Sequence, residues 1–176
     1  FLFIDKYDEK YIRKLDKKIA IIYRNYSIKY DKKLILKIKN TCKINGRKFF
    51  LSNNLRLATN LNLDGVYLPS FNISLNILKT NMKKDFIIIG SAHTIQEIKI
   101  KEKQGATAIF ISPLFKTKKN RNFLNPIKFN FLTLKTRQKI IALGGIATEN
   151  LNRLKVTRSY GFAGISYFKD NNKLKI

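Results

Sequence analysis

The length, composition and charge of the chain exclude several classes of protein. Its 176 residues, 44% of them hydrophobic, suit one domain with a buried core, which we expect to span residues 1–176. No apolar run approaches the roughly 20 residues that a membrane span needs. Because Cys42 and His93 are the only cysteine and histidine, an internal disulfide and a zinc site of the usual Cys/His kind are excluded.

The formal net charge is +25, from 36 Lys and Arg against 11 Asp and Glu. A field of that sign attracts nucleic acid, anionic lipid or phosphorylated small molecules. The basic residues recur along the whole chain, interleaved with Asn and Ile, which is typical of a compositional bias and not of a dedicated nucleic-acid face. Few aromatic residues accompany the lysine clusters and no nucleic-acid motif is present, so a nucleic-acid-binding protein is the least favoured interpretation.

The start of the chain and its lone cysteine favour the cytoplasm. The first residues are apolar but meet a charge at Asp5, without a basic leader or a small-residue cleavage site, so we expect no secretory signal. Cys42 lies within an apolar helical pattern, which predicts a buried thiol and fits a reducing compartment.

Eight short runs of β-branched or aromatic residues alternate with helical patterns. Several are apolar throughout, as expected for strands covered by helices on both sides. In chain order, the predicted strands are Leu2–Ile4, Ile19–Tyr23, Lys48–Leu51, Gly65–Leu68, Phe86–Ile89, Ala108–Ile111, Ile140–Leu143 and Gly161–Ile165.

The segments between the strands carry helix signals of different kinds. An apolar stripe from Leu34 to Cys42 ends at Gly46, and the residues from Thr94 to Glu97 have the spacing of a capping box. A loop and then a short helix are expected between Asn120 and Gln138. Two further predictions are a helix carrying Leu75, Leu78 and Met82, and one that carries Leu151 and Leu154 behind Thr148 as its N-cap.

Repeated strand–helix units imply parallel strands with right-handed crossovers. Eight units predict a compact (β/α)8 TIM-type barrel of the α/β class, with an open doubly wound sheet as the alternative. Such barrels usually have about 250 residues, so at about 22 residues per unit some connecting helices must be a turn or two, or absent.

In a parallel α/β fold, ligands bind where the strands end, and several polar segments follow predicted strands. Gly144-Gly145 would let backbone N–H groups approach an anion, although a tight turn with positive φ explains the pair equally well. Four cations between Lys116 and Arg121 form either a cationic lid or a solvated loop. His93 is either an acid/base group or a donor to a backbone carbonyl. The acidic residues fall mostly in helices or at strand starts, so carboxylate acid–base chemistry is not expected.

Four of these segments resemble thiamine phosphate synthases, in order and in spacing, over nearly the whole chain. The family patterns are "D-G-V-H-L", "G-S-A-H-T…E…GA", "G-P-x-F-x-T" and "A-I-G-G-I…E-N". The corresponding segments are Asp64–Leu68, Gly90–Thr94 with Glu97 and Gly105-Ala106, Ser112–Thr117, and Ala142–Ile146 with Glu149-Asn150.

The resemblance implies a barrel that joins an aminopyrimidine diphosphate to a thiazole phosphate, with Mg2+ holding the diphosphate as it leaves. It implies catalytic roles for Arg24, Ser91 and Lys119. The residues expected to bind phosphorylated substrates are Asn53, His93, Lys116, Thr117, Lys118, Gly144, Gly145 and Ser166, the last of which follows the final predicted strand.

The sequence departs from the family at the metal. The two magnesium aspartates align with Asn54 and Asn72, and an amide oxygen brings no charge to a hard cation that prefers carboxylates. We therefore expect the Mg2+ cofactor to be weakened or lost. One hypothesis is that the ammonium groups of Lys116, Lys118 and Lys119 take its place at the diphosphate.

Two interpretations within the family remain open. The basic loop after the sixth strand, Lys116–Arg121 (the sixth loop), and the Gly90–Thr94 segment favour a divergent synthase. The missing aspartates favour a TenI-like thiazole tautomerase, or a paralogue that binds thiazole phosphates without condensing them. A TenI-like tautomerase would have a histidine after the sixth strand, where Ser112-Pro113-Leu114 stands. Synthase is therefore preferred, with phosphorylated small molecules as partners, no membrane, and a homo-oligomer compatible with the sequence.

Overall fold

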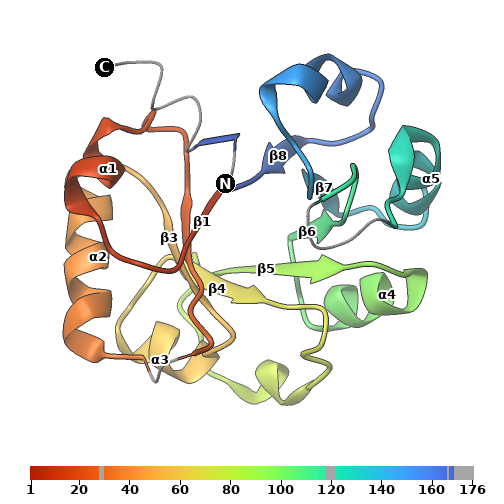
Figure 1. Cartoon of the computed structure of the whole chain (residues 1–176). Coiled ribbons are helices and arrows are strands. Elements are labelled where there is room, and N and C mark those ends of the chain that lie inside the picture. The colour runs from red at the N-terminus through yellow and green to blue at the C-terminus, as the bar shows by residue number, and fades with distance from the viewer. Residues whose placement is uncertain (28–29, 118–121, 166, 169–176) are drawn as a thin grey trace.

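The computed structural model describes residues 1–27, 30–117, 122–165 and 167–168. Eight parallel strands lie in sequential order in one sheet, and an isolated parallel bridge between Leu2 and Gly164 joins the last strand to the first. The strands form a TIM-type barrel (Figure 1), which confirms the predicted fold. The strands are β1 Leu2–Ile4, β2 Ile21–Tyr23, β3 Phe49–Ser52, β4 Gly65–Leu68, β5 Ile87–Ala92, β6 Ala108–Ile111, β7 Lys139–Leu143 and β8 Gly161–Ala163.

The lumen of the barrel is filled by side chains that alternate along the strands. Successive residues of a strand point to opposite faces, so every second side chain enters the lumen. The buried lumen residues are Phe3, Ile22, Phe50, Tyr67, Ile89, Ala108, Phe110, Ile141 and Ala163. Edge-to-face contacts of Phe3 with Tyr67 and with Phe110 fill the centre. The lumen is therefore a packed core, and ligands must bind at its ends.

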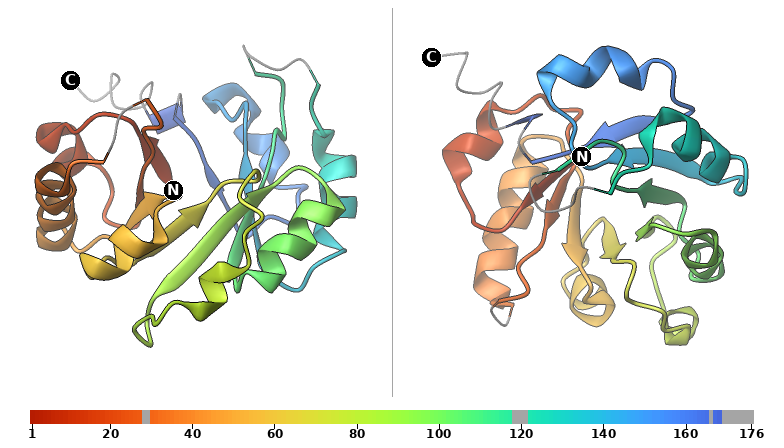
Figure 2. Two further views of the ribbon diagram at one scale, coloured as in Figure 1. Left: turned by 90° about the horizontal axis from the view of Figure 1, so that it is seen from below. Right: turned by 45° about the vertical axis from the view of Figure 1, so that its right-hand side comes forward.

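The connecting helices lie around the outside of the strands (Figure 2). Most are a turn or two long, which explains how eight units fit into 176 residues. They are α1 Glu9–Lys14, α2 Lys32–Ile44, α3 Leu55–Asn60, η1 Asn76–Lys79, α4 Ile95–Lys103, α5 Asn125–Thr133 and η2 Thr148–Leu154, where η marks a 3-10 helix.

The predicted helices were confirmed in part. The apolar stripe forms α2, and burial raises the pKa of the Cys42 thiol within it to about 12. The predicted helix through Met82 was wrong, because only the 3-10 helix Asn76–Lys79 forms there. Thr148 is the first residue of η2 and not its N-cap; Ala147 holds that position, and the Asn150 Oδ1 atom accepts from the Ala147 N–H at 3.1 Å.

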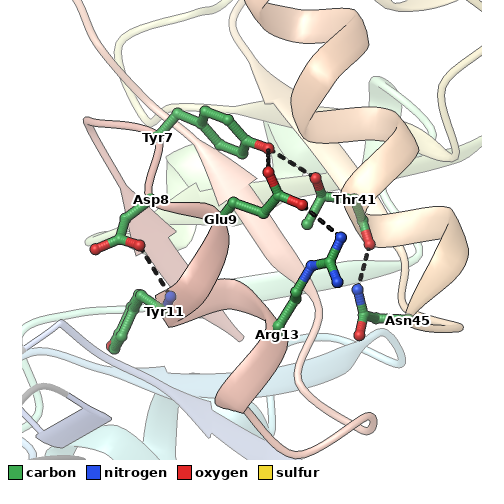
Figure 3. A network of polar contacts seen from close by, with 7 residues as sticks. All are labelled: Tyr7, Asp8, Glu9, Tyr11, Arg13, Thr41 and Asn45. Atoms are coloured by element: carbon green, nitrogen blue, oxygen red, sulfur yellow. Dashed lines mark hydrogen bonds and ion pairs between the residues drawn. The ribbon is translucent and has the colours of Figure 1, made fainter.

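A polar network fastens α1 to α2 beside the barrel (Figure 3). The Tyr7 hydroxyl lies 2.8 Å from the Thr41 hydroxyl and donates to Glu9 at 3.3 Å. Arg13 pairs with the same Glu9 carboxylate at 2.6 Å. The network fixes the loop after β1, which borders the cavity described below. Within the described residues, no helix has the length and apolarity needed to cross a membrane.

Candidate functional site

A cavity with a volume of about 740 Å3 lies over the ends of β1 and β2. Parallel strands bring all their carboxyl ends to one rim of a barrel, where TIM-barrel enzymes carry their active sites. The residues that line the cavity beyond β1 and β2 are Asp5, Lys6, Asp8, Tyr11, Arg24, Asn25, Tyr26, Ser27 and Ile165. Asp5, which directly follows β1, places a carboxylate beside the cavity.

Arg24 and Ser91 approach the same point in the lumen from different strands. The Arg24 guanidinium carbon lies 4.7 Å above the centre of the Phe3 ring, and that ring contacts Tyr67 edge-to-face at 5.1 Å. The Tyr67 hydroxyl donates to the Ser91 hydroxyl at 2.9 Å. Burial raises the pKa of Tyr67, and the Ser91 hydrogen bond and the Arg24 charge partly oppose that shift. These contacts place a fixed cation and two hydroxyls at the top of the barrel core.

Two details of this group differ from the sequence analysis. Ser91 lies inside β5 and not after it, so its inward direction is set by strand alternation. Tyr67 was not selected as a site residue, because the run Gly65–Leu68 looks like a plain core strand. Its position in the "D-G-V-H-L" segment, where the family has histidine, was the signal that could have found it.

Asn53 and Asn72 connect the loops after β3 and β4. The Asn72 side-chain amide donates to the Asn53 Oδ1 atom at 2.7 Å, and the Asn53 N–H donates to the Tyr67 carbonyl at 2.8 Å. Asn53 has a φ of 55°, a left-handed conformation that asparagine tolerates better than most residues. The structure therefore brings Asn53, Asn72 and Tyr67 together.

The two positions of the family's magnesium aspartates have side-chain oxygens that are already engaged. Asn54 Oδ1 accepts from the Leu57 N–H at 3.0 Å and caps α3, and Asn72 Oδ1 accepts from the Ser74 N–H at 3.1 Å. In the part of the chain that the structure describes, no group of three or more His, Cys, Asp or Glu could hold a metal ion. Neutral, engaged amides do not fit Mg2+, which prefers carboxylates and water.

The His93 ring contacts a backbone carbonyl. Its Nδ1 atom lies 2.6 Å from the Ser112 carbonyl oxygen, so Nδ1 donates. This is the contact required by the structural alternative, and it fixes the exposed imidazole against the loop after β6. The predicted capping box forms with a shift, because Glu97 accepts from the His93 N–H and Thr94 accepts from the Glu97 N–H.

Gly144 and Gly145 form a turn that packs against the loop after β6. Their φ values are 93° and 68°. A Cβ atom on Gly145 would lie 2.5 Å from the carbonyl oxygens of Phe115 and Lys116, so packing alone requires glycine. The Gly144 carbonyl accepts from the Phe115 N–H at 3.1 Å, which brings the Lys116-Thr117 segment beside the turn.

The turn also presents donors. The Asn150 side-chain amide holds the turn by donating to the Gly145 carbonyl at 2.7 Å. The Gly144 and Gly145 N–H groups have no hydrogen-bond acceptor among the described residues. Such adjacent N–H groups suit an anion. Lys118, Lys119 and Ser166, which the sequence analysis selected, lie outside the described residues.

The sequence matches the family described as thiamine monophosphate synthase over residues 13–168. A putative thiamine-phosphate synthase 2 of Aquifex aeolicus is 33% identical over 121 residues, which are 67% of this chain and 64% of that protein. The thiamine-phosphate synthase of Flavobacterium johnsoniae is 28% identical over 167 residues, 90% of this chain and 78% of that protein. The chain thus spans less than two thirds of the Aquifex relative.

Solved structures share the barrel. Thiamine phosphate pyrophosphorylase from Pyrococcus furiosus matches with a TM-score of 0.77 and 20% identity, over 99% of this chain and 91% of that chain. The citrate synthase SbnG matches with a TM-score of 0.66 and 10% identity, over 99% of this chain and 89% of that chain. At these identities the likeness shows the fold alone, because one fold carries many chemistries.

Proposed function

Because the chain belongs to the thiamine monophosphate synthase family, we propose that it joins hydroxymethylpyrimidine diphosphate to a thiazole phosphate with release of diphosphate. One observation carries the proposal: a cation with two hydroxyls and a pair of backbone N–H groups lie at the same rim of the barrel. Arg24 lies beside Tyr67 and Ser91, and the Gly144-Gly145 turn lies beside Lys116. Two phosphorylated substrates need two such places.

The proposed roles follow from the charge and position of each group. Arg24 and Ser91 bind the diphosphate and stabilise charge as it leaves, and the N–H groups of Gly144 and Gly145 receive the thiazole phosphate. Thr117 and Lys116 close this part of the site from the loop after β6. Asn53 and His93 complete the pyrimidine side. The family resemblance gives Lys119 a catalytic role and Ser166 a substrate-binding role, but both lie outside the described residues.

We propose that cations of the chain carry most of the charge compensation at the diphosphate. Family members use Mg2+ for this purpose, but the amides of Asn54 and Asn72 do not suit that ion. Arg24 is fixed at the rim, and Lys116, Lys118 and Lys119 would add ammonium groups from the sixth loop. A fixed cation stabilises a leaving diphosphate without reorganising at the moment of reaction.

The engaged amides of Asn54 and Asn72 also favour a second candidate, a TenI-like paralogue that tautomerises or binds thiazole phosphate. A single assay separates the two. The protein is incubated with both substrates, with Mg2+ or with EDTA, and thiamine phosphate is measured by mass spectrometry. We expect thiamine phosphate under both conditions. Conversion of thiazole phosphate alone, without any condensation product, would support the paralogue and overturn the synthase.

A further inference from the structure

Lys101 is a buried lysine without a carboxylate partner in hydrogen-bond contact among the described residues. It lies on α4 with an exposed fraction of 0%. Its Nζ atom donates to three oxygens, the Asn72 carbonyl at 2.6 Å, the Pro69 carbonyl at 2.8 Å and Gln104 Oε1 at 3.0 Å. Burial lowers the pKa of Lys101 to about 8, against a smaller opposing effect of Glu97. A buried charge is unfavourable unless specific contacts compensate for the lost water, and these three oxygens supply such contacts.

The barrel makes room for the lysine stem at a glycine. A Cβ atom on Gly90 would lie 2.7 Å from Lys101 Cδ, so any larger residue at position 90 would displace the stem. Gln104 adds two bonds from the next turn of the chain, because its amide donates to the Asn72 and Ser74 carbonyls, each at 2.9 Å. The end of α4 therefore holds the loop after β4 by several bonds at once.

The same loop is linked to the site through Asn72. On one side, the Asn72 carbonyl accepts from Lys101; on the other, its side-chain amide donates to Asn53 at 2.7 Å. Asn53 in turn binds the backbone of Tyr67, whose hydroxyl contacts Ser91. The contacts run without a break from the buried ammonium to the top of the barrel core.

We infer that Lys101 is a positioning residue that holds the loops after β3 and β4 in their binding arrangement without a metal ion. This inference rests on the proposed function for the ligand that it names. The family's magnesium aspartates stand in these two loops, and here an ammonium lies 2.6 Å from the carbonyl of Asn72 itself. A positive charge so close opposes a divalent cation at that residue, and the amide bridge supplies the link between the loops.

The test compares wild type with Lys101→Met, which keeps an apolar stem and removes the ammonium. Lys103→Met, an exposed lysine of the same helix, is the matched control for the lost charge. Hydroxymethylpyrimidine diphosphate is titrated by calorimetry in EDTA and again in excess Mg2+. We expect equal affinity in both buffers for wild type, about tenfold weaker binding for Lys101→Met, and no change for Lys103→Met. Thermal unfolding distinguishes positioning from folding, because Lys101→Met should unfold no earlier than wild type.

Two measurements without substrate test the inference independently. Hydrogen exchange should show the amides of residues 70–74 protected in wild type and Lys103→Met but exchanging faster in Lys101→Met. Mn2+, followed by its electron paramagnetic resonance, should stay free in the presence of wild type. Tight Mn2+ binding, or unchanged exchange and affinity in Lys101→Met, would overturn the inference. Absence of pyrimidine diphosphate binding to wild type would instead count against the proposed function, while exchange and Mn2+ still decide the role of Lys101.

Discussion

Individual residues decide most of the chemistry at this rim. Arg24 is held over the Phe3 ring at 4.7 Å, so its charge is fixed before any ligand arrives. A preorganised cation gains affinity because little freedom is lost on binding. The same logic applies to Tyr67 and Ser91, whose hydroxyls already share a hydrogen bond.

Replacing Arg24 should weaken binding of the diphosphate substrate while leaving the fold intact. In Arg24→Met the stem still covers Phe3, but the charge is lost, and we expect affinity to fall by about 1.5–3 kcal/mol, the usual value of a hydrogen bond to a charged group. Calorimetry with hydroxymethylpyrimidine diphosphate measures the change. Arg137→Met, which removes an exposed arginine just before β7, at the opposite end of the barrel, is the control. Equal affinities for the two variants would contradict the role of Arg24.

Lys101 should leave a signature in the pH dependence of stability. The pKa of this lysine is lowered to about 8 from its ordinary value of 10.5, so the folded state releases the proton before the unfolded state does. Burial of the charged form lowers the free energy of unfolding by about 3 kcal/mol, from the difference between the two pKa values. This loss is complete below pH 8 and disappears as the pH rises towards 10.5. Chemical denaturation should show wild type gaining stability relative to Lys101→Met across that window. A constant difference between the two proteins would show that Lys101 keeps an ordinary pKa.

Among the elements, the turn after β7 and the loop after β6 form one unit. The Gly144-Gly145 turn approaches the backbone of Phe115 and Lys116 so closely that no side chain fits between them. This packing holds Phe115 and Lys116 at the rim whether or not a phosphate is bound. Packing thus explains the glycine pair, and its N–H groups, which have no acceptor in the part of the chain that the structure describes, provide the proposed binding function in addition.

Alanine at Gly145 should destabilise the protein more than alanine at Gly46. Both glycines have positive φ, 68° and 63°, but Gly46 has no atom within 4 Å of a Cβ position. Gly46→Ala should therefore lower the free energy of unfolding only by the cost of a positive φ for alanine, about 1–2 kcal/mol. Gly145→Ala should lower it further, because its methyl group collides with two carbonyl oxygens. Denaturant unfolding of both variants gives the difference. Equal losses would mean that the sixth loop moves aside freely.

Strands were easier to predict than helices, for a physical reason. Each strand is a short apolar run set by burial on both faces, and all eight predicted runs form strands within a few residues. The helix through Met82 failed because a stripe of apolar residues does not distinguish an α-helix from a 3-10 turn. In the site, glycines and the basic loop were visible as motifs. Tyr67 was overlooked although its place in the "D-G-V-H-L" pattern marked it. Lys101 was not visible, because the partners of a buried lysine appear only once the chain is folded.

At the scale of the whole molecule, the net charge of +25 raises the question of nucleic acid. The basic residues recur along the whole chain, and few aromatic residues accompany the lysine clusters. We therefore expect only non-specific binding of duplex DNA. In a gel shift, complexes formed at about 50 mM salt should vanish by about 200 mM. A sequence-selective complex that survives the higher salt would favour the nucleic-acid interpretation.

The most direct test of the account is a crystal structure of the protein with thiamine phosphate, the proposed product. We expect the phosphate to accept hydrogen bonds from the Gly144 and Gly145 N–H groups, with the pyrimidine ring on the side of Arg24 and Ser91. A product bound away from this rim, or with its two ends reversed between these groups, would contradict the proposed arrangement.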